Sequence, residues 1–435
     1  MLLSALLAAT LCGATALTSH AQDTAKPSEK PETKETPKVA QAAPAQPATP
    51  APAAPAAPAG PAPGSVTVTG LVDIYYGVNG RAPSGPGKSP FTGVTTVGSP
   101  GEFIGIDNAG RAFDINDRTP SLSLGEVNIV RTANKSFPIG ITATLTFGDT
   151  ARLVHANEPG GTSSWQTLQQ LYFSKTSHFW GRDFTFDFGK FVTPFGNEVI
   201  ESSSNDNYSR SFGFVYAIPF YHAGIRATVP LTNQLSLATG IVNGWNNVAD
   251  DNNGKSAFGQ LTWKPNSHFT GILTYMGGPE GTGAFGSGIP TNGGGSIGTS
   301  LGELIGTYQV DSKLKFTFEA DHARAAGTVL GTPVSGSWVS MAGYAKYQFT
   351  PRFAVAARIE QFEDIPGVGG TGLHFGAYTK LNEATLTAEY LMFGGRLVNR
   401  LEYRHDHANY GLFGTANGTA VGDQDTYYVS SVYKF

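Results

Sequence analysis

The chain has 435 residues, of which 14% are charged and 55 are glycine, whereas soluble domains carry about 25% charged residues. Aromatic residues make up 11%, and the formal net charge is −4. A single cysteine, Cys12, excludes a disulfide framework and a four-cysteine zinc site. Because the chain has no basic block, nucleic acid is not an expected partner. Few charges with many glycines and aromatic residues indicate an all-β chain that contacts something other than water.

Residues 1–21 are predicted to be an export signal. Residues 2–17 form one apolar run, which is shorter than the ~20 residues that a membrane-spanning helix needs. Ser19 and Ala21 place small residues at the two positions that a signal peptidase reads. Cleavage after Ala21 is therefore expected, although no Lys or Arg precedes the apolar run. The mature chain would then contain no cysteine and would lie outside the cytoplasm.

Residues 22–64 are predicted to be a disordered spacer. The segment is rich in Lys and Glu up to Lys38 and consists almost only of Ala and Pro after it. It has no set of apolar residues that could form a core, so burial cannot offset the entropy lost on ordering. Its prolines favour an extended polyproline II conformation. The barrel topology inferred below would place this spacer in the periplasm.

Residues 65–435 repeat a period-two pattern that is typical of β-strands. Residues 139–147, for example, have Ile, Ile, Ala, Leu and Phe at the odd positions and only Gly and Thr at the even positions. The same pattern predicts strands near residues 65–79, 121–133, 138–147, 165–175, 183–192, 220–230, 235–243, 256–264, 268–276, 299–310, 314–323, 337–349, 352–363, 383–392, 397–406 and 424–435. These segments are close in length to the 9–11 residues that cross a bilayer at a tilt.

The connections between these strands alternate strictly in length. Those after odd-numbered strands are long and those after even-numbered strands are short, as in outer-membrane barrels with long outward loops and tight periplasmic turns. An open sheet edge is not tolerated in hydrocarbon, so the first and last strands must pair. We therefore predict a transmembrane, antiparallel, up-and-down β-barrel of about sixteen strands in the bacterial outer membrane, wide enough for a water-filled interior.

Charged residues within the strands indicate which face points inward. An arginine on the lipid side costs about 2–4 kcal/mol near the bilayer midplane. Arg226, Arg358, Arg400 and Arg404 lie opposite their apolar neighbours, so we expect them to face the interior. Lys190 breaks the pattern because it shares a face with phenylalanines, so either a bulge redirects it or its amine reaches the headgroups.

The third outward loop, residues 193–219, differs from the glycine-rich connections. It carries Glu198, Glu201, Asp206 and Arg210, followed by a stretch rich in aromatic residues. A loop with that much apolar surface is not expected to lie in bulk water. We expect it to fold into the barrel and narrow it, with its acidic residues facing the inward arginines. The alternatives are that it packs on the rim or on a neighbouring subunit, or that its charges only satisfy one another.

The last strand ends in an aromatic residue. Phe435 is terminal, and Tyr433 lies on the same face. This arrangement resembles the signal that the outer-membrane insertion machinery reads, and we expect these two residues to act as an assembly signal. An ordinary edge strand with aromatic residues is the alternative.

Several motifs resemble one family of bacterial outer-membrane barrels, the OmpL-like porin-2 family. They are GLVDIYY at residues 70–76, FGKFVTPFGNE at 188–198, YSRSFGFVYAIPFYHAG at 208–224, NGW at 243–245 and LEYRHD at 401–406. The resemblance covers roughly residues 65–435 and implies an outer-membrane porin through which small hydrophilic solutes and ions diffuse passively. It carries over no binding residues. Fold analogy alone suggests a homotrimer.

Enzymatic and metal-binding functions are not expected. The sequence indicates no strand-to-helix nucleophile elbow that would expose a serine, and the Gly-Lys-Ser string within residues 85–89 lacks the strand and helix of a phosphate loop. His405 and His407 share a face, but no third ligand accompanies them. We therefore predict no cofactor, no metal and no catalytic residue. The alternative function is a structural barrel that anchors the envelope or adheres to surfaces without conducting.

Overall fold

The computed structural model describes residues 62–83, 107–155, 165–250, 252–281, 296–329, 332–368 and 373–435. The predicted export signal, residues 22–61 of the predicted spacer, and the Gly-Lys-Ser string lie outside these residues.

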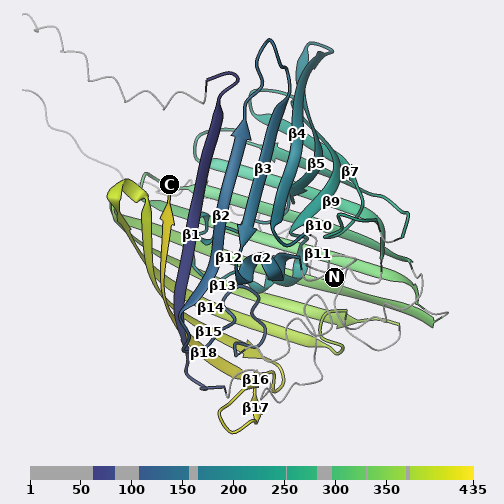
Figure 1. Cartoon of the computed structure of the whole chain (residues 1–435). Helices are drawn as coiled ribbons and strands as arrows, with labels where there is room; N and C mark the ends of the chain where they lie inside the picture. Colours follow the sequence, from purple (N-terminus) through teal and green to yellow (C-terminus); the bar gives the residue numbers. More distant parts are fainter. Residues whose placement is uncertain are drawn as a thin grey trace, which may run out of the picture. The chain divides into compact units, whose positions relative to one another are not determined.

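Sixteen strands close into one antiparallel barrel (Figure 1), as predicted. They are β1 (Val66–Asn79), β2 (Ser121–Arg131), β3 (Gly140–Phe147), β4 (Leu168–Phe179), β5 (Arg182–Val192), β6 (Tyr221–Pro230), β7 (Leu235–Val242), β8 (Ser256–Trp263), β9 (Phe269–Gly281), β10 (Ser296–Gln309), β11 (Leu314–Val329), β12 (Thr332–Thr350), β13 (Phe353–Pro366), β14 (Thr379–Met392), β15 (Leu397–Ala408) and β18 (Asp423–Lys434). The strands β16 (Phe413–Gly414) and β17 (Ala420–Val421) form a separate two-stranded sheet.

The described helices are short. They are the α-helix α2 (Asp149–Val154), the π-helical turn η3 (Gly213–Ala217), and the 3-10 turns η2 (Ser202–Ser204) and η5 (Phe393–Gly395). Among the described residues, no helix is long and apolar enough to cross a membrane.

The first and last strands close the barrel. Leu71 pairs with Lys434 in the register of β1 and β18. Beyond this pair, the Gly70 amide donates to the Phe435 carbonyl at 3.0 Å, and the Phe435 amide donates to the Gly70 carbonyl at 3.0 Å. The edges that an open sheet would expose are therefore paired to each other, as lipid requires.

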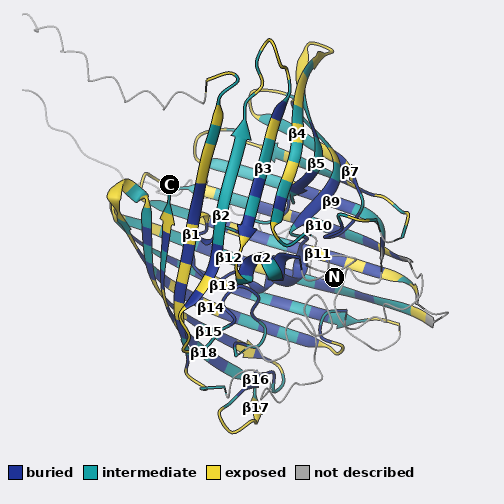
Figure 2. Ribbon diagram, viewed as in Figure 1, coloured by how far each residue is buried: buried dark blue, intermediate teal, exposed yellow. Residues whose placement is uncertain are grey.

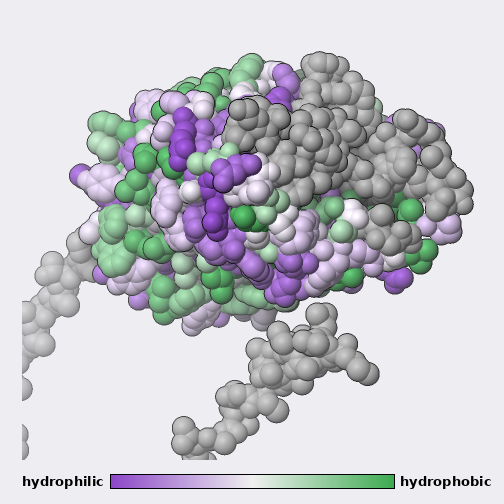
Figure 3. Space-filling view, turned by 90° about the horizontal axis from the view of Figure 1, so that it is seen from below, coloured by the Kyte–Doolittle hydropathy of each residue, from purple (hydrophilic) through white to green (hydrophobic). Residues whose placement is uncertain are grey.

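Side chains alternate between an apolar outer face and a polar inner face. In β15, Arg400, Glu402 and Arg404 are buried inside the barrel, whereas Leu401 is exposed on the outside. Figure 2 displays the same alternation as bands of buried and exposed residues along the strands. Seen from below (Figure 3), hydrophilic residues gather over the described middle of the face, and hydrophobic areas alternate with hydrophilic ones around its outline. An apolar outer face with a polar inner face is the reverse of the arrangement in a soluble protein and fits a barrel surrounded by lipid.

The connections differ from prediction in one place. We expected a long outward loop between strands near 314–323 and 337–349, but β11 and β12 pair up to Val329 and Thr332, so only residues 330–331 connect them. Ala323 and Ala325 pack inside the barrel, so inward and outward side chains still alternate along this hairpin. The remaining long connections follow odd-numbered strands, as predicted.

An apolar cluster fills part of the interior. It joins Phe212 and Phe214 of the loop 193–219 to Trp245, Trp338 and Phe362. The Trp245 and Trp338 rings lie 5.9 Å apart, and the Trp338 indole N–H donates to the Ala217 carbonyl at 3.1 Å. The loop is thus packed by its own aromatic residues against strands β12 and β13.

Lys190 points inward rather than toward the headgroups. Its amine donates to the Leu168 carbonyl at 2.6 Å and lies 3.2 Å from His155 Nδ1. The register of β5 has no shift at this position, so a bulge in β5 does not redirect it. Instead, Gly189 has a φ of +136°, which turns the strand just before Lys190. The expected snorkelling to the lipid interface is therefore wrong.

Candidate functional site

Residues 193–219 cross the interior of the barrel. The Ser202 hydroxyl donates to Asp73 Oδ2 on β1 at 2.5 Å. On strands far from β1 in the barrel order, the Gly196 amide donates to Glu303 on β10, and the Asn197 amide donates to Glu319 on β11 at 3.0 Å. The loop therefore contacts walls that are not neighbours, and any path through the barrel must pass beside it.

Carboxylates of the wall accept hydrogen bonds from backbone amides of the loop. Glu402 accepts the amides of Tyr208 and Ser209 at 2.5 and 2.9 Å. Glu360 accepts the amides of Phe212 and Gly213 at 2.6 and 2.5 Å. The loop is thus attached to β13 and β15 through its backbone.

Glu198 and Arg358, two of the residues expected at a constriction, form a buried ion pair. Glu198 Oε1 lies 2.5 Å from Arg358 Nη1, and its other oxygen accepts the Ser211 amide at 2.7 Å. Arg358 also contacts Glu383 at 2.6 Å. Because both Glu198 and Arg358 are buried, this pair fixes the loop to β13 and presents little charge to water.

Arg400 and Arg404 are also buried and hold loop carbonyls. Arg400 pairs with Glu389 at 2.6 Å and donates to the carbonyls of Ser202 and Asn205 at 2.6 and 2.7 Å. Arg404 pairs with Asp406 at 2.7 Å and donates to the Arg210 carbonyl at 2.5 Å. These two arginines bind the backbone of the loop rather than its acidic side chains.

Glu201 and Arg210 lie outside the expected charge pairs. Glu201 accepts a hydrogen bond from the Gln169 amide at 2.6 Å. The Arg210 guanidinium donates to the carbonyls of Ile200 and Tyr208 and lies 4.5 Å from the centre of the Phe113 ring. Among the described residues, neither Glu201 nor Arg210 forms an ion pair.

Several charged residues of the interior remain partly exposed, among them Asp206, Arg226, Lys315 and Lys346. Asp206 of the loop lies 2.8 Å from Lys315 and 3.6 Å from Lys346, whose side chains are 32% and 21% exposed. Asp187 on β5 pairs with Arg226 on β6 at 2.8 Å. Water inside the barrel can therefore reach Asp206 with its two lysine partners and, separately, Arg226, whose partner Asp187 is buried.

Sequence reasoning missed the two lysines and the wall carboxylates that hold the loop. Lys315 and Glu319 lie on the polar face of a strand that alternation identifies. Alternation therefore indicated that they face inward. It gave no indication of which part of the loop each would contact.

Two histidines and two aromatic residues on the outer face of the barrel lie apart from this site. His405 Nδ1 lies 2.8 Å from Asp425 and His407 Nδ1 lies 2.7 Å from Asp423, and both histidines are well exposed. Each ring thus lies beside a carboxylate, and Asp423 is also 3.8 Å from His405 Nε2. Tyr433 and Phe435 are also exposed on the outside, with ring centres 6.5 Å apart.

Comparisons with known proteins agree with the fold. A family model described as "Putative beta-barrel porin-2, OmpL-like" matches residues 65–435. The solved structure of outer-membrane expressed OmpT of Vibrio cholerae aligns with a TM-score of 0.50 and 12% identity over 85% of this chain and 97% of that chain. The outer membrane channel DcaP of Acinetobacter baumannii aligns with a TM-score of 0.50 and 10% identity over the same shares of the two chains. Among curated proteins, no sequence matches this chain.

Proposed function

Because the chain belongs to the OmpL-like beta-barrel porin-2 family of the bacterial outer membrane, we propose that it forms a water-filled channel for passive diffusion of small hydrophilic solutes and ions. The observation that carries this proposal is the presence of partly exposed charges inside the barrel, among them Arg226, Asp206, Lys315 and Lys346. Charged groups that retain water inside a lipid-embedded barrel are expected where an aqueous path runs. In this proposal the loop 193–219 forms the constriction.

Planar-bilayer conductance of the refolded protein tests this function directly. The expected result is discrete, stepwise current in simple salt, with weak ion selectivity because acidic and basic groups are mixed along the path. Sugars and short peptides added to the chamber should reduce the current if they enter the constriction. A folded barrel that inserts into the bilayer without any current would contradict the proposal.

A structural barrel that anchors the envelope or adheres to surfaces is the second candidate. The observation that favours it is the apolar cluster of Phe212, Phe214, Trp245, Trp338 and Phe362, which occupies part of the interior. An anchor requires no aqueous path, so it would fold and insert normally but stay silent in the conductance measurement. Catalysis is not part of either proposal.

The partners belong to the same proposal. The outer face contacts lipid, and Tyr433 and Phe435 serve as the signal for the insertion machinery. The export signal of residues 1–21 would direct the chain out of the cytoplasm, and the spacer of residues 22–64 would remain in the periplasm. A homotrimer is the proposed assembly, which cross-linking in intact outer membranes can test.

A further inference from the structure

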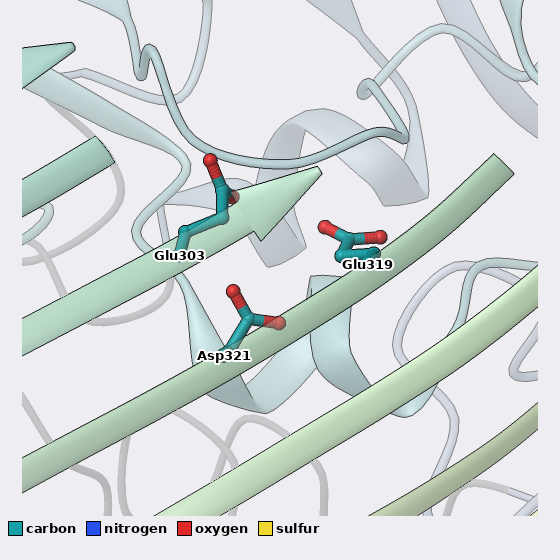
Figure 4. A group of neighbouring side chains, drawn as sticks. All are labelled: Glu303, Glu319 and Asp321. Atoms are coloured by element: carbon teal, nitrogen blue, oxygen red, sulfur yellow. The ribbon is translucent and has the colours of Figure 1, made fainter. Parts of the chain in front are cut away.

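Three carboxylates gather on the inner face of β10 and β11. The register pairs Glu303 directly with Asp321, and Glu319 lies two residues before Asp321 on the same face. Figure 4 depicts Glu303 on one strand and Glu319 and Asp321 on its neighbour. Each residue offers one carboxylate oxygen, and these three oxygens all lie within 4.8 Å of one another. All three side chains are buried.

The hydrogen bonds of this acidic cluster come from neutral donors. Glu303 accepts the Gly196 amide and the Thr274 hydroxyl, the latter at 2.9 Å. Glu319 accepts the Asn197 amide at 3.0 Å and the Tyr344 hydroxyl at 3.1 Å. Among the described residues, none forms an ion pair with a member of the cluster. Three other buried acids of the wall, Glu383, Glu389 and Asp406, each have an arginine partner. Glu360 and Glu402, like Glu303 and Glu319, accept hydrogen bonds only from backbone amides and hydroxyls of the described residues.

Asp321 provides a second, independent observation. Its side chain is 2% exposed, and neither of its oxygens has a hydrogen-bond partner among the described residues. Leaving a buried polar group without a partner is destabilising, and more so when the group is charged. Like charges that face each other directly across two strands destabilise the pair further. A partner that supplies positive charge to Asp321 would remove both costs.

We propose that Glu303, Glu319 and Asp321 form a binding site for a hard divalent cation, with Ca²⁺ preferred to Mg²⁺. Carboxylate oxygens are the ligands that hard cations select, and Ca²⁺ accepts irregular coordination completed by water, whereas Mg²⁺ demands near-octahedral geometry. The ion would balance the charge of the cluster. Because Glu303 and Glu319 also accept amides of the loop 193–219, the bound ion would strengthen the attachment of the loop to β10 and β11. The site does not depend on whether the barrel conducts.

Equilibrium dialysis with radioactive Ca²⁺ tests the site. The refolded protein is stripped with a chelator and dialysed at pH 7.5 against Ca²⁺, with Mg²⁺ as competitor. We expect the unmodified protein to bind one Ca²⁺ per chain in this cluster, and Asp321→Asn and Glu303→Gln to bind it at least about tenfold more weakly. The matched control is Asp187→Asn, which removes an interior carboxylate that already has Arg226 as partner, and it should bind like the unmodified protein.

A second measurement separates loss of the site from loss of the fold. Folded barrels are counted by their heat-modifiable migration in gels, and their thermal midpoint is recorded with and without Ca²⁺. A ligand that binds only the folded state raises this midpoint, so Ca²⁺ should raise it for the unmodified protein and for Asp187→Asn but not for Asp321→Asn or Glu303→Gln. No Ca²⁺ binding by the unmodified protein at millimolar concentration, or unchanged binding in both cluster variants, would overturn the proposal.

Discussion

At the scale of single residues, buried carboxylates act on the backbone of the loop 193–219. Glu402 is an example, because its two oxygens accept the amides of Tyr208 and Ser209 as well as the Thr387 hydroxyl. Ion pairs within the interior, such as Glu198 with Arg358, then hold neighbouring parts of the same loop. Neutralising a wall carboxylate should therefore loosen the loop while leaving the barrel closed.

We expect Glu402→Gln to release the loop locally. The glutamine carbonyl oxygen can still accept one loop amide, but its NH2 group would face the other amide, and both are donors. At least one charge-assisted hydrogen bond, worth about 1.5–3 kcal/mol, is therefore lost. Limited proteolysis should then cut within residues 193–219 several times faster, while the barrel still shifts in gels on heating. Glu363→Gln is the control, because Glu363 contacts Lys380 at the rim. Equal cleavage rates in both variants would show that Glu402 does not hold the loop.

His155 should make the stability of the protein depend on pH. Burial, and then the adjacent Lys190 amine, lowers the pKa of His155 to about 2, from an ordinary value of about 6.5. Above pH 6.5 this histidine is neutral in both the folded and the unfolded chain and contributes nothing to the pH dependence. Below it only the unfolded chain takes up the proton, so folding loses up to about 1.4 kcal/mol per pH unit as the pH falls.

The test is the thermal midpoint of the refolded protein between pH 7 and pH 4. His155→Gln should flatten the fall of the midpoint with acidification. His178→Gln serves as the control because the His178 side chain is 67% exposed, and it should retain the slope of the unmodified protein. An unchanged slope in His155→Gln would mean that the segment around His155 opens and admits the proton while the barrel stays folded.

At the scale of elements, one glycine decides how β5 continues. Gly189 has a φ of +136°, and a Cβ added there would lie 2.2 Å from the Leu171 carbonyl oxygen and 2.9 Å from Tyr172 Cα. Both are backbone atoms of the neighbouring strand, so they cannot move aside as a flexible side chain would. The turn at Gly189 is also what directs Lys190 into the barrel.

We expect Gly189→Ala to impair folding of the barrel. The strained backbone costs about 1–3 kcal/mol before the clash is counted. The yield of heat-modifiable barrel after refolding should fall severalfold, and its urea midpoint should decrease. Gly259→Ala is the matched control, because nothing lies within 4 Å of a Cβ at that strand position. Normal refolding of Gly189→Ala would mean that β4 and β5 can separate without cost.

The strands could be predicted from the sequence because their periodicity is local. Lipid outside and polar groups inside impose alternation on every strand, and each strand pairs with its neighbour in sequence. The same reasoning failed for residues 324–336, where it predicted a long loop. There, Ala323 and Ala325 continue the alternation with side chains so small that the pattern is hard to recognise.

The contacts of the loop could not be predicted in this way. Gly196 meets Glu303, and Phe212 meets Glu360, across more than a hundred residues of sequence that no local pattern spans. The donors are backbone amides, which every residue except proline carries, so no side-chain type marks them. Opposite charges suggested that the acidic residues of the loop would face the wall arginines, but only Glu198 of that set pairs with one.

At the scale of the whole molecule, burial divides the interior charges into two sets. Glu198, Arg358, Arg400 and Arg404 are buried in contacts that hold the loop. Lys315 and Lys346 remain partly exposed around Asp206. An ion in the water of the barrel interacts most with charges that water also reaches, because the buried pairs already neutralise each other. Selectivity should therefore follow the two lysines.

We expect Lys315→Gln and Lys346→Gln, alone and together, to shift the channel toward cations. Each substitution removes one positive charge near the path and leaves Asp206 less compensated. The reversal potential in a tenfold salt gradient measures the shift, which should shrink at high salt because screening shortens the reach of each charge to about 3 Å at 1 M. Lys313→Gln is the matched control, because Lys313 lies two residues before Lys315 in the exposed turn between β10 and β11. A shift of equal size in Lys313→Gln would place the selective charges at the turns, and no shift in any variant would place the ion path on the far side of the loop from the lysines.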